Sequence, residues 1–211
     1  DPSKIKVIKN GIHLDNVVLP EINNLKENLD LKDKFIISYV GTHGMAHALD
    51  FILKSLTEVY DEAFHFIFIG DGAEKQKLVN LSKNLNLKNT TFLPSVTKNE
   101  ISSYLQISDV ALVNLKKSDL FKLVIPSKIF ENIFFKNPIL LGVEGESKLL
   151  INKYRVGIAF KPEDTQSFLS SLIKIKTFKN KSFNCNCDVM LQDFDRKKLS
   201  HEMLLFIKNN I

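Results

Sequence analysis

The chain has 211 residues, 44% hydrophobic and 25% charged, and its 29 basic and 24 acidic residues give a formal net charge of +5. This composition excludes collagenous, intrinsically disordered and disulfide-stapled proteins. Cys185 and Cys187 stand too close together for an ordinary disulfide and supply only half of a zinc site, which favours a reducing compartment. We therefore expect one large α/β domain, or a domain plus a tail.

The charge is spread through the chain and forms no basic stripe, so nucleic acid is not an expected partner. The most apolar region, residues 125–143, contains charged residues and does not predict a membrane span. The chain starts at Asp1 without a Met or a signal peptide, and we expect it to be a piece of a longer cytoplasmic protein. Its weakly basic surface suits an anionic substrate or peripheral contact with a membrane, although a plain solvated surface is the simpler explanation.

Residues 1–20 contain a strand-like run, Ile5–Ile8, and are expected to be a linker. From residue 34 onward, apolar runs alternate with helical patterns, which predicts a Rossmann-like α/β domain with a doubly wound, mostly parallel sheet over residues 21–180. The predicted strands are residues 35–40, 64–69, 91–93, 110–115, 139–141 and 157–160. Residues 181–211 form a tail, and its last part is an amphipathic helix with Asp195 as a candidate N-cap.

Ligands of open parallel sheets bind beyond the carboxyl ends of the strands, so the residues directly after each predicted strand are the candidates. After the first strand come Gly41, Thr42, His43 and Gly44, which can let backbone amides approach a phosphate at a helix N-terminus. A tight turn that uses glycine for a positive φ explains these residues equally well. His43 either donates to an anion or lies on the surface, and His47 is expected in the first turn of the next helix.

The segments after the second and third predicted strands are explained first by the residue preferences of turns and helix caps. Gly70-Asp71-Gly72 predicts a turn, in which Asp71 can also cap the following helix. After the third strand, Thr97 and Glu100 match a capping box. The same loop, through Pro94 and Val96, can offer backbone groups to the edge of a nucleobase.

The segment after the fourth strand is the most informative. Pro126 and Ser127 mark a helix start, because proline fixes φ and a serine hydroxyl can cap. Lys128 and Glu131 then lie on one face of the first turns. The ammonium and the helix amides can take a pyrophosphate, and a carboxylate one turn later can accept ribose hydroxyls, so the segment predicts a nucleoside diphosphate site. A surface Lys–Glu pair is the alternative.

Taken together, these motifs resemble the carboxyl-terminal half of a group-one retaining glycosyltransferase of the GT-B fold, and the resemblance covers essentially the whole chain. Four stretches carry it: residues 10–13 ("NGID"), 70–93 ("GDG…L…NV.F.G"), 108–111 ("AD") and 126–139 ("PSKIFEYMAAGKPVI"). Residues 142–147 and 161–164 also resemble the branch that builds bacterial surface polysaccharides and includes N-acetylfucosaminyl-transferase-like proteins.

The resemblance implies a nucleotide-sugar donor, expected to be UDP-linked, whose sugar passes with retention to a saccharide or lipid-linked acceptor without a metal or other cofactor. It implies that Glu131 holds the donor ribose. The first Glu of the family's E-x7-E motif falls where this chain has Leu123. Many members also carry an Arg and a Lys in the first glycine-rich loop, where this chain has Thr42, His43 and His47, so Lys128 would carry more of the phosphate charge.

The resemblance further implies an acceptor-binding half before residue 1, against which the helix after Asp195 would pack as a crossover helix. No catalytic residue is assigned. Donor binding is assigned to Gly41, Thr42, His43, Gly44, Gly72, Pro94, Val96, Ser127, Lys128 and Glu131. Two other interpretations stay open. One is a nucleotide-sugar epimerase or phosphorylase-like protein of the same fold, and the other is a non-catalytic α/β nucleotide-binding scaffold, which the missing first Glu supports.

Overall fold

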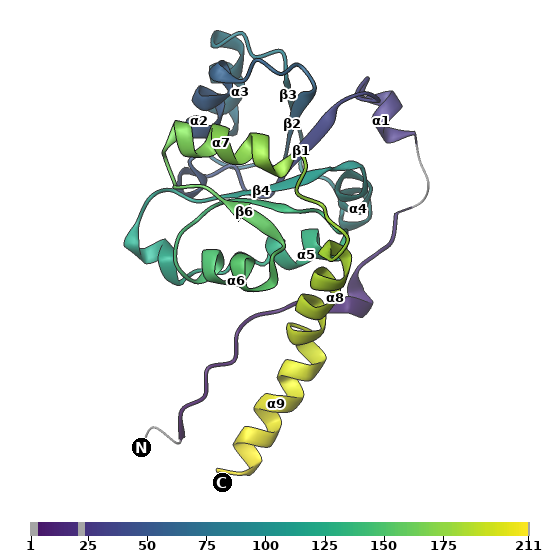
Figure 1. Cartoon of the computed structure of the whole chain (residues 1–211), viewed down its shortest axis with the longest axis vertical. Coiled ribbons are helices and arrows are strands. Elements are labelled where there is room, and N and C mark those ends of the chain that lie inside the picture. Colours follow the sequence, from purple (N-terminus) through teal and green to yellow (C-terminus); the bar gives the residue numbers. More distant parts are fainter. Residues whose placement is uncertain (1–3, 21–23, 211) are drawn as a thin grey trace.

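A computed structural model describes residues 4–20 and 24–210, which build an α/β fold around one sheet (Figure 1). The six strands are all parallel and follow the order β3-β2-β1-β4-β5-β6, which confirms the predicted doubly wound class. Their bounds are β1 Phe35–Val40, β2 Phe64–Ile69, β3 Thr90–Leu93, β4 Val110–Asn114, β5 Ile139–Gly142 and β6 Gly157–Ala159. Each predicted strand is therefore confirmed to within about one residue, well inside the usual uncertainty of element boundaries.

Helices cover both faces of the sheet, with α2, α3 and α7 on one side and α5, α6 and α8 on the other (Figure 1). The helices are α1 Leu25–Asn28, α2 Leu49–Ser55, α3 Lys75–Asn84, α4 Lys98–Ile107, α5 Lys128–Phe134, α6 Glu146–Tyr154, α7 Thr165–Ile175, α8 Phe183–Asp193 and α9 Arg196–Lys208. Short 3-10 turns include η3 Met45–His47 and η5 Asp119–Leu123. Within the described ranges, no helix combines the length and the apolar character that crossing a bilayer requires.

Alternate residues of the central strands reach opposite cores. In β1, Ile37 and Tyr39 join the cluster under α2 and α7, while Ile36 joins a smaller cluster beside α4. Every residue of β2 is buried, as expected for a parallel strand covered on both faces. This two-sided packing fixes the carboxyl edge of the sheet, and therefore the loops that follow the strands.

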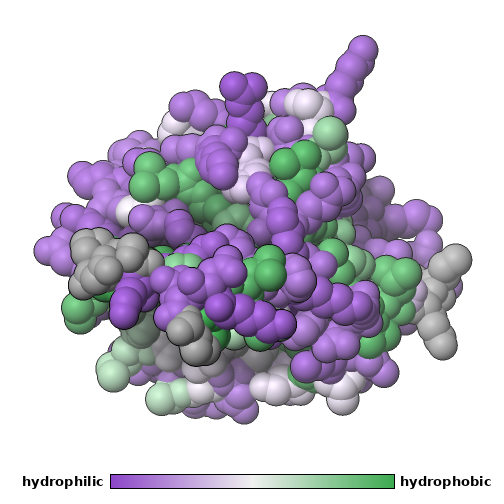
Figure 2. Space-filling model, turned by 90° about the horizontal axis from the view of Figure 1, so that it is seen from below, coloured by the Kyte–Doolittle hydropathy of each residue, from purple (hydrophilic) through white to green (hydrophobic). Residues whose placement is uncertain are grey.

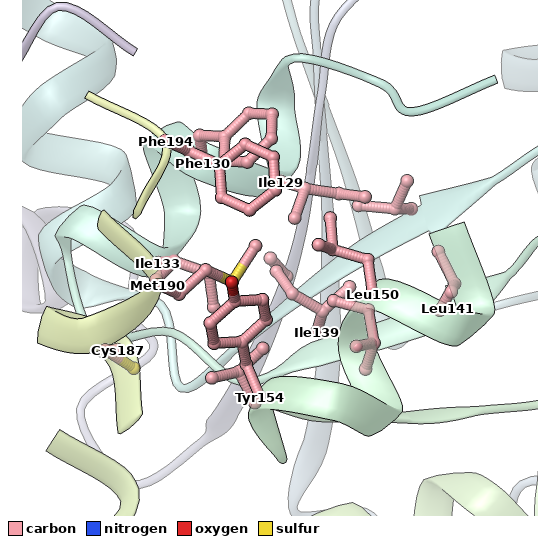
Figure 3. Packing of buried hydrophobic residues seen from close by; sticks show 14 of the residues in the cluster. Ile129, Phe130, Ile133, Ile139, Leu141, Leu150, Tyr154, Cys187, Met190 and Phe194 are labelled. Carbon is pink, nitrogen blue, oxygen red and sulfur yellow. The ribbon is translucent and has the colours of Figure 1, made fainter. Parts of the chain in front are cut away.

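The core continues into the predicted tail. The side chains of Phe183, Cys187 and Met190 of α8 are buried in the same cluster as α5 and α6. Figure 3 shows Met190 beside Ile133 of α5, within this cluster. The rings of Phe130 and Phe194 lie 4.9 Å apart between centroids. Packing in this part of the chain thus extends past residue 180, where the sequence placed the end of the domain.

In contrast to α8, α9 has no buried residue and projects from the body beside the N-terminal segment (Figure 1). Its predicted N-cap is confirmed, because the Asp195 carboxylate accepts a hydrogen bond from the backbone N–H of Lys197 at 3.1 Å. Viewed from below, apolar side chains form separate groups among hydrophilic ones (Figure 2). Met203 and Ile207 are two of the half-exposed apolar residues of α9.

The predicted strand at Ile5–Ile8 is wrong. This segment is irregular and does not pair with the sheet, and the side chains of Ile5 and Val7 are exposed. Pairing occurs instead at Ile12, whose backbone N–H donates to the Phe194 carbonyl and whose carbonyl accepts from the Arg196 N–H, both at 2.9 Å. The predicted domain start at residue 21, like Asp1, lies outside the described residues.

Candidate functional site

The loops after β1 and β2 are joined to each other at the carboxyl edge of the sheet. The backbone N–H of His43 donates to the Asp71 carbonyl at 2.8 Å, and the N–H of Glu74 donates to the His43 carbonyl at 2.9 Å. A side chain at Gly70 or Gly72 would overlap the backbone of the first loop, and both glycines have positive φ. Close approach of the two loops therefore requires these glycines.

Lys75, at the start of α3, ties the ends of two strands together. Its ammonium donates to the carbonyls of Gly70 at 2.6 Å and Leu93 at 2.7 Å. The prediction that Asp71 caps this helix is wrong, because the chain first turns back over the loop after β1 and α3 begins only at Lys75. The Asp71 carboxylate instead accepts from the backbone N–H of Gly72 at 2.7 Å.

The Lys128 ammonium is buried at the start of α5. It lies 4.1 Å from the centroid of the Tyr39 ring and close to Gly41, where a Cβ would come within 2.7 Å of Nζ. It has no hydrogen-bond partner, and burial lowers its pKa to about 8. The alternative of a surface Lys–Glu pair is therefore wrong: the ammonium is buried without a hydrogen-bond partner, and Glu131 acts on it only through the attraction between their charges.

Two imidazoles lie next to this cation, and both contact the Tyr39 ring, at 5.7 Å for His43 and 5.8 Å for His47 between centroids. His43 is fully buried with both ring nitrogens unpartnered, so its predicted alternative as a surface residue is wrong. Burial, and then the charge of Lys75, lowers the pKa of His43 to about 4; burial also lowers the pKa of His47. His47 lies in η3, just ahead of α2, and not in the first turn of that helix as predicted.

Glu131 lines a hollow of about 310 Å³ between α4, α5 and the N-terminal segment, together with Ser127 and Arg196. Burial raises the pKa of Glu131, while Lys98, Lys128 and Arg196 act in the opposite direction. A second hollow, of about 250 Å³, is lined by residues of the loops after β1, β2 and β3. Ile101 of α4 lines both hollows, so the two are neighbours. A carboxylate that can accept hydroxyls thus lies one helical turn from a buried ammonium whose N–H donors are unused.

The sequence profile of the family described as "Glycosyl transferases group 1" matches residues 21–186. The chain belongs to this family. No curated protein matches the chain by sequence.

Solved structures agree with the glycosyltransferase family in fold. HepE from Anabaena, in complex with UDP, has a TM-score of 0.80 at 15% identity over 97% of this chain and 57% of its own. Sucrose-phosphate synthase from Thermosynechococcus elongatus has a TM-score of 0.77 at 15% identity, over 97% and 52%. The lipopolysaccharide outer core galactosyltransferase WaaB, in its apo form, has a TM-score of 0.74 at 14% identity, over 98% and 56%. The chain therefore spans little more than half the length of these proteins.

The structure groups the predicted donor-binding residues of this glycosyltransferase chain only in part. The hollow of about 250 Å³ is lined by Gly41, Thr42 and Val96, and the hollow of about 310 Å³ is lined by Ser127 and Glu131. The remaining residues line neither of these two hollows. Lys128 is buried beside Gly41, and His43 and Gly72 pack against each other. Gly44 lines a third hollow of about 200 Å³, and Pro94 is exposed.

Two finer predictions about these residues are corrected. The Ser127 hydroxyl makes no cap, because Ser127 already has helical φ and ψ of −59° and −31° and follows Pro126 in a turn that leads into α5. Of the two glycines in the first loop, only Gly41 uses a positive φ (139°); Gly44 has φ of −115°, which any residue can adopt.

Three residues of the site were missed by sequence reasoning. Tyr39 was counted only as part of a strand, although its place near the carboxyl end of β1 is a signal that such residues face the ligand edge. Lys75 follows a recognised turn, but its two carbonyl acceptors lie far apart in the chain, Gly70 just after β2 and Leu93 at the end of β3. Arg196 reaches the larger hollow only through the path of α8, which no local pattern shows.

Leu123, which stands where the family's first motif Glu is expected, is 80% exposed in η5. Its apolar side chain offers no acceptor to a sugar hydroxyl. Among the described residues, no three His, Cys, Asp or Glu side chains gather in the manner of a metal site. The arrangement is suited to binding an anion beside a pair of hydroxyls.

Proposed function

We propose that the chain binds the nucleotide-sugar donor of a retaining glycosyltransferase, and that this donor is UDP-linked. The observation that carries the proposal is the buried ammonium of Lys128, which lies beside Gly41 without a hydrogen-bond partner. A diphosphate supplies the missing counter-charge, and Glu131 accepts the ribose hydroxyls. The UDP complex of HepE, a protein of similar fold, supports a uridine nucleotide.

In this role the residues stabilise the diphosphate leaving group by electrostatics. Lys128, with a pKa of about 8, is mostly protonated at neutral pH and presents its donors in a dry environment. The loop after β1 adds the backbone amide of Thr42, since the N–H groups of Gly41 and His43 already donate to the carbonyls of Ile69 and Asp71. His43 and His47, which burial keeps neutral, add ring N–H groups without further charge.

The wider reaction is part of the same proposal. An acceptor-binding half would precede residue 1, and α9 would cross to it. The acceptor is a saccharide or a lipid-linked saccharide, the process is bacterial surface polysaccharide synthesis in the N-acetylfucosaminyl-transferase-like branch, and no cofactor takes part. The protein works in the cytoplasm with, at most, peripheral contact with the membrane. The similarity in fold to WaaB, a lipopolysaccharide galactosyltransferase, supports this assignment.

Calorimetric titration with UDP tests donor binding. We expect Glu131→Ala to weaken UDP by about 1.5–3 kcal/mol, the range for a hydrogen bond to a charged group. Glu58→Ala is the matched control, because this exposed glutamate lies after α2, away from the carboxyl edge of the sheet. Wild-type affinity in Glu131→Ala would remove the ribose assignment.

Product analysis of the full-length protein tests the reaction. Release of UDP that depends on an acceptor supports transfer. Isomerised donor in the absence of an acceptor supports an epimerase instead. Saturable UDP binding without any turnover of a UDP-sugar supports the non-catalytic nucleotide-binding scaffold.

A further inference from the structure

Tyr39 contacts three basic side chains of the site, Lys128, His43 and His47, each of which has at least one buried nitrogen without a hydrogen-bond partner. Its ring lies 4.1 Å from the Lys128 ammonium and within 6 Å, between centroids, of the rings of His43 and His47. Its hydroxyl donates a 2.7 Å hydrogen bond to the carbonyl of Thr42. Tyr39 itself is buried near the end of β1, so the sheet fixes its position.

We propose that Tyr39 is a positioning residue of the diphosphate site: its ring holds the Lys128 ammonium beside Gly41, and its hydroxyl fixes the turn at Thr42. One side chain thereby sets the spacing between the loop after β1 and the start of α5. This inference rests on the proposed function, and adds to it a group that would not itself touch the donor.

An aromatic face suits this task better than a carboxylate does. The ring attracts a desolvated ammonium through its quadrupole and leaves the N–H donors free for an anion. A carboxylate at the same place would take up those donors and compete with the anion for the charge. Burial raises the pKa of Tyr39, so its hydroxyl stays protonated and continues to donate to Thr42. Gly41 completes the arrangement because it has no Cβ in the space that Lys128 Nζ occupies.

The pH dependence of UDP binding reports on this lysine. The titratable groups that face Lys128 are Tyr39 from β1, His43 and His47 from the following loop, and Glu131 from α5 itself. Both imidazoles are neutral above pH 7, since burial lowers their pKa. The diphosphate is fully ionised there, its last pKa being about 6. UDP affinity is therefore expected to fall as the pH rises past the pKa of Lys128, about 8.

The test replaces Tyr39 by Phe and by a series of ring-fluorinated phenylalanines, which keep the ring's shape and weaken its quadrupole stepwise. Tyr39→Phe is expected to keep UDP affinity within about threefold, the size of one neutral hydrogen bond. Along the fluorinated series UDP affinity should fall by about tenfold relative to Tyr39→Phe. Uridine affinity should change by less than about twofold, because cation–π attraction acts on the ammonium alone. The pH at which half of the UDP affinity is lost should be lower in the fluorinated variants than in Tyr39→Phe, because the ring attracts the protonated amine less.

The same fluorinated residues at Phe66, which is buried in the core under α2 and α7, are the control and should leave both affinities unchanged. A UDP affinity and an alkaline midpoint that stay constant along the series would overturn the role of Tyr39, as would an equal loss for uridine and UDP. Wild-type protein that binds neither UDP nor uridine would instead overturn the proposed function, and this inference with it.

Discussion

Two lysines at the carboxyl edge of the sheet have opposite surroundings. Lys75 donates to the carbonyls of Gly70 and Leu93, at 2.6 and 2.7 Å, and so joins the ends of β2 and β3. Lys128 has no hydrogen-bond partner and is held over the ring of Tyr39. A lysine whose donors are used by the protein stabilises the fold, whereas a buried ammonium with free donors destabilises it until an anion binds. Within one group of loops, Lys75 therefore stabilises the fold and Lys128 is the candidate for anion binding.

The replacement of Lys75 is expected to have the largest effect on stability. We expect Lys75→Met to lower the free energy of unfolding by roughly 3 kcal/mol, because two carbonyls lose a charged donor. Urea denaturation measures the change. Lys77→Met in the same helix is the control, since its ion pair with Glu74 is exposed and should contribute less than about 1 kcal/mol. Equal stability of the Lys75→Met and Lys77→Met variants would remove the structural role of Lys75.

Burial lowers the pKa of His43, and the charges of Lys75 and Lys128 lower it further. Its pKa is about 4 in the folded protein against 6.5 for an ordinary histidine, so the unfolded chain binds more protons between these values. Its contribution to stability is present above pH 6.5 and is lost as the pH falls through 4, by roughly 3 kcal/mol.

Unfolding in urea at pH 7, 5.5 and 4 measures this loss. His43→Leu should lose less stability over that range than the wild type, and Lys75→Met should fall between them because the pKa of His43 rises when the nearby charge is removed. Identical pH profiles for the three proteins would show that His43 is not held neutral by its surroundings.

The smallest effect on stability is expected for Lys128→Met. Removing a buried, unpartnered charge should leave the free energy of unfolding unchanged at pH 7 or raise it by about 1–2 kcal/mol. Folded Lys128 loses its proton near pH 8 and the unfolded chain only near 10.5, so the wild type gains stability with rising pH in that window. By pH 10 the wild type should therefore have gained stability relative to Lys128→Met. A loss at pH 7 as large as that of Lys75→Met would mean that the ammonium has a structural partner.

The parts of the molecule that local patterns determine were predictable. Apolar runs marked all six strands, and the capping box at Thr97 is confirmed, with the Glu100 carboxylate accepting from the Thr97 N–H at 2.8 Å. In α8 the apolar residues Phe183, Cys187 and Met190 also recur at helical spacing, but the asparagines between them make this pattern hard to recognise in the sequence. The Ser127 cap failed because the turn at Pro126 places Ser127 inside helical geometry before α5 begins.

The surroundings of the site residues could not be predicted, because they depend on elements far apart in the chain. Nothing near Lys128 in the sequence shows that its ammonium lies over the Tyr39 ring. The same residues are equally consistent with a solvated Lys128–Glu131 pair on the surface. The two acceptors of Lys75 lie at the ends of different strands, Gly70 just after β2 and Leu93 in β3. Sequence reasoning therefore identified the residue types of an anion site, but it could not show that the ammonium of Lys128, at the start of α5, lies over the ring of Tyr39 from β1 without a hydrogen-bond partner.

The central claim is that the unpartnered Lys128 ammonium is the diphosphate-binding group. Calorimetric titration of UDP and of uridine into the wild type and Lys128→Met at pH 7 tests it most directly. The account predicts that Lys128→Met loses about 1.5–3 kcal/mol of UDP affinity, as expected for a charge-assisted hydrogen bond, while uridine binding changes little. Equal UDP affinity in the two proteins, or an equal loss for uridine and UDP, would contradict it.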